Sequence, residues 1–243
     1  MEYFSKKTVS FGLGLLFFTS LLSANQTLTL NTTGLPPLNT PQQSGFMDLI
    51  AKEAFLRVNL ELITVKLPAE RGLKNSNSGI EDGEMSRVKG IEKQYPNLVR
   101  VPETIMEWQF VAFSKNDIDL SNGWKDLAQH SIAYINGWKI LEKNANFKNA
   151  VRVRNSEQLF KLLTSNRTDV ILYERWGGLL AKSQAKLSNA MLIQPALAKK
   201  SMYIYLHKKH AHLVDKLSAA LTNMKADGTY QKIYDLTLAP LKQ

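Results

Sequence analysis

Segments typical of β-strands and of α-helices alternate along almost the whole of this sequence. The first unit spans residues 27–67: a polar–apolar alternation at 27–31, a helical face, and an apolar, β-branched run at 60–67. The helical face runs from Met47 to Val58 with apolar residues at i, i+3, i+4, i+7, i+8 and i+11, and Ser44 is its expected N-cap. Strand, helix and strand in this order predict a parallel pair joined by a right-handed crossover, so the expected fold class is α/β.

A second cluster of alternating elements begins after residue 116. Strands are predicted at 131–135, 151–153 and 169–173, and Ser156 is the expected N-cap of a helix between the last two. Toward the end of the chain the pattern predicts a strand at 202–206 and a helix from Val214 to Met224 that stops at Asp227-Gly228. After the first unit, and still within the first cluster, it predicts a helix at about 70–75, a loop at 79–87 and a strand at 108–113.

The two clusters predict two α/β lobes that the chain joins twice. With crossovers expected near 113–117 and 195–202, lobe 1 is residues 25–113 plus 202–243, and lobe 2 is residues 117–195. Such a molecule has a cleft between its lobes, and clefts of this kind are where small ligands bind.

Residues 1–24 are typical of a signal peptide. Lys6 and Lys7 form a positive start, residues 9–22 are mainly apolar, and Ser23 and Ala24 are small. The alternative is an uncleaved anchor, but a bilayer span needs about 20 apolar residues and this stretch is shorter. We therefore expect cleavage near Ala24 and a soluble periplasmic protein, which agrees with the absence of cysteine.

The sequence contains no pattern typical of an enzyme or of a cofactor or metal site. It has no G-x-S-x-G, G-x-G-x-x-G or P-loop motif, and the four histidines lack zinc-site spacing. We expect the segment H-K-K-H-A-H at 207–212 to be a solvated surface cluster. Glu81, Asp82 and Glu84 crowd together, and we interpret them as turn acids in water.

The net charge of +10 does not by itself predict a nucleic-acid partner. Apart from the doublets Lys199-Lys200 and Lys208-Lys209, basic residues are spread evenly, and no basic stretch is interleaved with aromatic residues. A solvated basic surface is the expected outcome.

Side chains at the ends of the predicted strands suit a small ligand that carries both charges. Arg71 follows the strand at 60–67 and Arg87 lies in the loop at 79–87, and a guanidinium meets a carboxylate with two parallel hydrogen bonds. Glu174 directly follows the strand at 169–173, at the edge of the sheet where α/β ligand sites lie.

Two further sets of residues extend this candidate site. Asn136, Gly137 and Trp138 stand at a strand-to-helix junction, where free backbone N–H groups can hold an anion. Candidate stacking surfaces for the ligand are the aromatic residues Trp108, Trp138, Tyr173 and Trp176.

Five stretches carry a resemblance to a known family: L-P-A-E-R-G-L (67–73), G-I-E-D-G-E-M-S-R (79–87), I-A-Y-I-N-G (132–137), S-E-Q-L-F-K-L-L-T-S-N-R-T-D-V-I-L-Y-E (156–174) and M-K-A-D-G-T-Y-Q-K-I (224–233). Together they resemble solute-binding protein family 3, the polar amino-acid type of periplasmic binding protein that serves ABC transporters. The resemblance covers nearly the whole chain after residue 24. It implies the two-lobed type II fold and a monomer that closes on a small polar or zwitterionic solute for delivery to a membrane permease.

The resemblance also implies residue roles. Arg87 would bind the ligand's carboxylate, Glu174 its amine, Arg71 would point into the cleft, and residues 136–138 would contact the ligand from the second lobe. Two departures from the family pattern point to a ligand other than a standard amino acid. Residues 34–38 contain no aromatic residue, and the segment between Asp82 and Arg87 is shorter than in the amino-acid binders.

Two other functions are open for a chain of this kind. One is a sensor module that signals to a membrane partner without transport. The other is a dehydratase-like enzyme on the same fold, which would need a titrating carboxylate in the cleft, Glu84 or Glu174.

Overall fold

The structure, a computed structural model, describes residues 1, 26–145 and 147–242. Residues 2–24 of the expected signal peptide, and the cleavage site near Ala24, lie outside the described residues. Within the described part of the chain, no helix combines the length and the apolar character needed to cross a membrane.

Eight strands form one mixed sheet in the order β2-β1-β3-β8-β4-β7-β5-β6. Their bounds are β1 Gln26–Thr32, β2 Leu60–Lys66, β3 Gly83–Arg87, β4 Leu98–Ser114, β5 Ile132–Ile135, β6 Val151–Val153, β7 Val170–Glu174 and β8 Met191–His207. The pairs β1–β2, β1–β3, β5–β6 and β5–β7 are parallel, as expected for α/β crossover units, whereas β4 and β8 run antiparallel to their neighbours.

Helices follow most of the strands. The α-helices are α1 Phe46–Leu56, α2 Ala69–Ser78, α3 Lys139–Asn144, α4 Ser156–Thr164, α5 Arg175–Gln184, α6 Val214–Ala226 and α7 Thr229–Thr237. Four 3-10 helices complete the described elements: η1 Ile91–Lys93, η2 Gly123–Gln129, η3 Lys208–Leu213 and η4 Ala239–Lys242. The α/β architecture predicted from the alternating pattern is confirmed.

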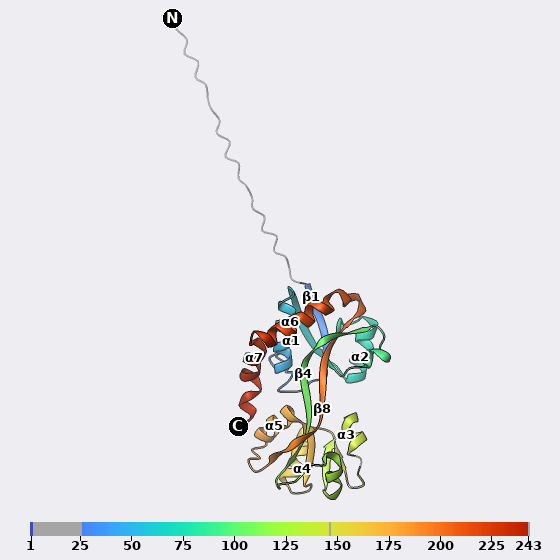
Figure 1. Ribbon diagram of the computed structural model, residues 1–243, viewed down its shortest axis with the longest axis vertical. Helices are drawn as coiled ribbons and strands as arrows, with labels where there is room; N and C mark the ends of the chain where they lie inside the picture. Colours follow the sequence, from blue (N-terminus) through green and yellow to red (C-terminus); the bar gives the residue numbers. More distant parts are fainter. Residues whose placement is uncertain (2–25, 146, 243) are drawn as a thin grey trace.

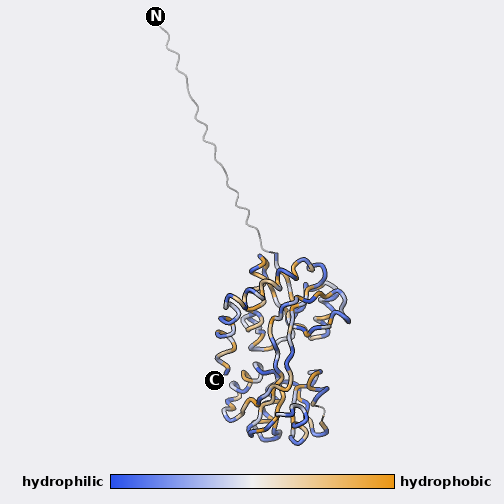
Figure 2. Tube along the Cα trace, viewed as in Figure 1, coloured by the Kyte–Doolittle hydropathy of each residue, from blue (hydrophilic) through white to orange (hydrophobic). Residues whose placement is uncertain are grey.

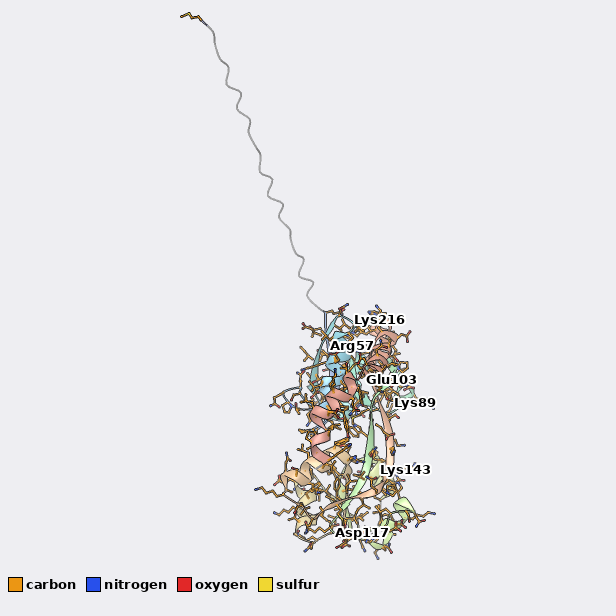
Figure 3. All side chains as sticks on the ribbon, turned by 60° about the vertical axis from the view of Figure 1, so that its left-hand side comes forward. Arg57, Lys89, Glu103, Asp117, Lys143 and Lys216 are labelled. Carbon is orange, nitrogen blue, oxygen red and sulfur yellow. The ribbon has the colours of Figure 1, made fainter. Side chains whose placement is uncertain are left out.

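The long strands β4 and β8 connect two separate bodies, drawn above and below in Figure 1. Each has 17 residues, and they pair from Leu98 with His207 to Ser114 with Met191. Their middle section is hydrophilic in Figure 2, with Glu107 opposite Ser201 and the exposed Lys199 and Lys200 beside it. Figure 3 places Arg57, Glu103 and Lys216 on one body and Asp117 and Lys143 on the other.

Each body has its own hydrophobic core. The upper core joins α1, α6 and β1 with one end of β4, up to Met106, and one end of β8, from Met202. The lower body packs apolar residues on both faces of β7 and β5, beginning in β4 at Phe110. Along β4 the change from the upper core to the lower core falls between Met106 and Phe110, before the crossover expected near 113–117. Along β8 the change falls between Ala198 and Met202, within the crossover expected near 195–202. The lobe limits expected from the sequence stay a prediction.

Several local predictions were wrong, for the strands because their partners are distant in sequence and for two helix N-termini because a neighbouring residue makes the cap. The expected loop at 79–87 contains strand β3, which pairs with β1 and β8, and β4 and β8 extend well beyond 108–113 and 202–206. The N-cap of α1 is Gly45 rather than Ser44, because the Asp48 carboxylate accepts the Gly45 N–H at 3.0 Å. The N-cap of α4 is Asn155 rather than Ser156, since Asn155 Oδ1 accepts from the Gln158 N–H at 2.9 Å.

Candidate functional site

A cavity of about 700 Å³ lies where the two bodies face each other. It is lined by the residues that follow β1 and β2 in the upper body, by the middle of β4, and by the residues that follow β5 and β7 in the lower body. Parallel strands of an α/β sheet present ligand sites at their carboxyl ends, and here both bodies contribute such ends. The lining residues are Thr33, Gly34, Leu35, Pro36, Leu38, Lys66, Leu67, Pro68, Ala69, Trp108, Phe110, Asn136, Gly137, Trp138, Lys139, Ile140, Tyr173, Glu174 and Gly177.

Six of the nine residues singled out in the sequence line this cavity: Trp108, Asn136, Gly137, Trp138, Tyr173 and Glu174. Trp176, expected as a stacking surface for the ligand, lies outside the lining because its ring packs in the upper core. The two arginines, Arg71 and Arg87, lie outside the lining. Their roles as ligand contacts are therefore not supported by the geometry, for the reasons given below.

Glu174 is the buried charged group of the cavity. It ends β7 and caps α5, where its Oε2 accepts the Gly177 N–H at 2.8 Å. Only 3% of the residue is exposed, and its Oε1 is buried without a hydrogen-bond partner among the described residues. Burial raises the pKa of Glu174 to about 7, against the lowering effect of the Gly177 and Trp176 backbone N–H groups and of Arg175.

Four aromatic rings form one wall of the cavity. Trp138 stacks on Tyr173 with ring centroids 5.0 Å apart and an interplanar angle of 23°, and Phe110 meets Trp138 edge-on at 5.9 Å. Trp108 lies 6.5 Å from Trp138, and its indole Nε1 is buried without a partner among the described residues. The rings come from β4, β7 and the start of α3, so this wall belongs to the lower body and the connecting strand.

Two backbone N–H groups of the junction at residues 136–138 already have acceptors within the protein. The Asn136 N–H donates to the Val153 carbonyl at 2.9 Å, which continues the β5–β6 pairing. The Gly137 N–H donates to Glu142 Oε1 at 2.8 Å, and Gly137 adopts a φ of 87° that favours glycine. Neither of these two N–H groups is free to hold an anion, and the anion-holding role of the junction stays a prediction.

Arg87 is occupied by an acid of its own strand. Its Nε donates to Glu84 Oε2 at 2.8 Å, its Nη2 lies 2.7 Å from the same oxygen, and Nη2 also donates to the Ala69 carbonyl at 3.2 Å. Arg71 projects from α2 as an exposed residue. The cations that do line the cavity are Lys66 and Lys139, both exposed.

Neither lysine was among the residues singled out in the sequence, although a signal for each exists. Lys66 is the last residue of β2, and Lys139 begins α3 directly after the junction at 136–138. Lys66 has the same strand-end placement that singled out Glu174, and Lys139 adjoins a junction that was already singled out.

The segment Thr33–Leu38 closes the upper side of the cavity and is held by Asp48, a fully buried carboxylate of α1. Asp48 Oδ1 accepts from Asn39 Nδ2 at 2.6 Å, and Oδ2 accepts from the N–H groups of Thr40 at 2.8 Å and Gly45 at 3.0 Å. Asn39 in turn accepts from Thr32 Oγ1 at 3.0 Å. This network joins the end of β1 to the start of α1, so the shape of the cavity depends on a residue that does not line it.

Two expectations about polar clusters were also wrong. Glu84, expected to be a solvated turn acid, is 1% exposed, because β3 forms inside the sheet. His210, expected at the surface, is 8% exposed and pairs through Nε2 with Asp82 Oδ1 at 2.7 Å. Among the described residues no group of three or more His, Cys, Asp or Glu side chains is arranged to hold a metal ion.

The sequence matches no known protein-family model. An uncharacterised protein of Shewanella oneidensis is 24% identical over 193 residues, which cover 76% of this chain and 73% of that protein.

Solved structures are similar over most of the chain. An ancestral arginine-binding protein bound to arginine superposes with a TM-score of 0.66 at 21% identity and covers 87% of this chain and 97% of its own. The GluR0 ligand-binding core from Nostoc punctiforme in complex with L-glutamate gives 0.68 at 17% identity, with 86% and 98% covered.

A third similar structure is a histidine kinase sensor domain with similarity to periplasmic binding proteins. Its TM-score is 0.69 at 15% identity, with 88% of this chain and 96% of that chain covered. The chain therefore has the two-lobed α/β fold of the solute-binding proteins of family 3.

Proposed function

We propose that this protein binds a small polar solute in the cavity between its lobes and closes around it by a hinge motion in β4 and β8. The observation that carries this proposal is Glu174, a buried carboxylate that lines a 700 Å³ cavity and has one oxygen without a partner. A buried acceptor of this kind is costly unless a donor reaches it. An amine or another N–H group of a ligand would supply that donor.

The division of the lining between the lobes supports closure as the mechanism. The upper body, which is the upper lobe, contributes residues 33–38 and 66–69. The lower body, which is the lower lobe, contributes Glu174 and the stacked rings of Trp138 and Tyr173. A ligand that touches both sides stabilises the closed arrangement over the open one, and this differential affinity shifts the population.

The similar solved structures support the same class of function. One was solved with arginine and one with L-glutamate, both small amino acids. We propose by analogy that this protein is exported to the periplasm after cleavage near Ala24 and delivers its solute to an ABC-type permease.

A sensing role is the second candidate, because one similar structure is the sensor domain of a histidine kinase. Binding and closure would be the same in both cases, and only the membrane partner would differ. Co-purification from membranes, with and without the bound solute, would separate a permease from a signalling partner.

Thermal unfolding against a panel of amines, amino acids and organic acids tests the binding step. A ligand at 100 times its dissociation constant adds about 2.7 kcal/mol to the free energy of unfolding, which raises the melting temperature by several degrees. Glu174→Gln should remove the shift, and the matched control Glu157→Gln, at an exposed acid of the same lobe, should keep it. A shift that survives Glu174→Gln would contradict the assigned site.

A further inference from the structure

We propose that the solute is a primary or secondary amine on an aromatic or apolar body, without a carboxylate on the amine-bearing carbon. This inference rests on the proposed function and names the chemical class that its site selects. The charged residues that line the cavity, and how deeply each is buried, support this assignment.

The charged residues of the lining are divided by depth. Glu174 is 3% exposed, whereas Lys66 is exposed and the Lys139 side chain is 93% exposed, with its Nζ 3.7 Å from Glu142. A cationic amine bound at Glu174 meets a buried carboxylate, whereas the charges of the two lysines are screened by solvent. The buried part of the cavity therefore favours a positively charged group of the ligand over a negatively charged one.

Three donors that would hold a carboxylate in the site are already used, and the unpaired indole Nε1 of Trp108 is neutral and brings no charge to pair with a carboxylate. The Gly177 N–H donates to Glu174 itself, and the Gly137 N–H donates to Glu142. Arg87 is bound to Glu84 and lies outside the lining. An α-carboxylate would be buried next to a like charge without a cation, and an unpaired buried charge costs far more than an imperfect hydrogen bond.

The walls beside Glu174 suit the rest of such a ligand. An apolar surface for an aromatic body of the ligand is formed by the rings of Trp108, Phe110, Trp138 and Tyr173. The faces of aromatic rings also attract ammonium groups. Since Glu174 Oε1 lacks a donor, an amine that keeps an N–H fits better than a quaternary ammonium, which has none.

Isothermal titration of the purified protein with matched probes tests the inference. The pairs are phenethylamine with phenylalanine and tryptamine with tryptophan, and the quaternary probe is phenethyltrimethylammonium. We expect each amine to bind at least tenfold more tightly than its amino-acid counterpart and than the quaternary probe. We also expect Glu174→Gln to weaken amine binding at least a hundredfold, and Glu157→Gln to leave it unchanged.

A double variant, Lys66→Ala with Lys139→Ala, separates the two classes of ligand. Amine binding should become tighter, because two cations near the ligand are removed, whereas a ligand held by its carboxylate would bind more weakly. Tighter binding of the amino acids, with loss in Glu174→Gln, would overturn this inference and leave the proposed function standing. Amine binding that survives Glu174→Gln would overturn both the inference and the assigned site, and no binding by any of these probes would overturn the inference.

Discussion

Arg87 and Glu84, three residues apart on β3, form a nearly buried ion pair, with Arg87 Nε 2.8 Å and Nη2 2.7 Å from Glu84 Oε2. This pair explains why the arginine expected to bind a carboxylate is not part of the cavity. The bulge between Glu84 and Arg87 in the β3–β8 pairing accompanies this contact. One oxygen of the acid, Glu84 Oε1, remains without a partner among the described residues.

Glu84 and Glu174 should make the protein less stable as pH rises from about 4.5 to 7, whereas His207, whose pKa is lowered by burial, acts in the opposite direction. Burial raises the pKa of Glu84 to about 7 despite the Arg87 charge, and burial raises the pKa of Glu174 to about 7 as well. Between the unfolded value of 4.5 and the folded value, the folded chain binds more protons than the unfolded chain. Each group then lowers the free energy of unfolding by roughly 1 kcal/mol per pH unit.

Urea titrations at pH 4.5, 6 and 7.5 check this sign. Glu84→Gln should remove about half of the slope that these two groups cause, and Glu61→Gln, at an exposed acid on β2, should leave it unchanged. A slope that Glu84→Gln does not alter would show that Glu84 ionises normally in the folded protein.

Asp48→Ala should destabilise the protein and weaken ligand binding together. The substitution leaves the side chain of Asn39 and the N–H groups of Thr40 and Gly45 without their acceptor, at about 1–3 kcal/mol for each buried donor that stays unpaired. Because these residues hold the segment that lines the cavity, the dissociation constant should rise as well. Chemical denaturation and titration calorimetry measure the two effects. Asp117→Ala, at an exposed acid, is the control, and equal effects of the two substitutions would refute the role of Asp48.

Gly178→Ala should cost about 1–3 kcal/mol of stability through overpacking. A Cβ at this position would overlap Cε2 of Phe113, a ring that is fully buried between α5 and β4. The ring has little room to move because Phe160 packs against it at 5.7 Å. Thermal unfolding gives the measurement, and Ser183→Ala, on the exposed side of the same helix, should be nearly neutral. Equal melting temperatures for the two variants would contradict the close approach.

Trp176→Ala should destabilise the protein by about 3–5 kcal/mol, the range for truncation of a large buried aromatic residue. Trp176 stands on α5, directly after the lower strand β7, yet its ring joins the upper core and meets Tyr234 of α7 edge-on at 5.7 Å. It therefore contributes to the attachment between the lobes on the side of the C-terminal helices. Trp124→Ala, at a half-buried residue packed only within the lower core, should cost less. The reverse order in a denaturant titration would contradict this placement.

The alternating pattern was sufficient to predict the architecture. Apolar spacing placed α1, α6 and the buried strands β2, β5 and β7 to within a few residues, because each of these elements has its pattern in contiguous sequence. Glu174 and Trp138 were found for a similar reason, since a residue that follows a buried strand must emerge at the edge of the sheet.

The environment of each charged residue depended on contacts that are distant in the chain. Strand β3 pairs with β1, about fifty residues earlier, and with β8, more than a hundred residues later, and this place inside the sheet buries Glu84. His210 likewise meets Asp82 from η3, at the far end of the chain. Local sequence thus specifies which segments are strands and helices, because hydrophobic periodicity acts over a few residues. Which cations face the ligand, and which are held by acids instead, follows from how the strands assemble, because charge pairing acts between groups brought together in space.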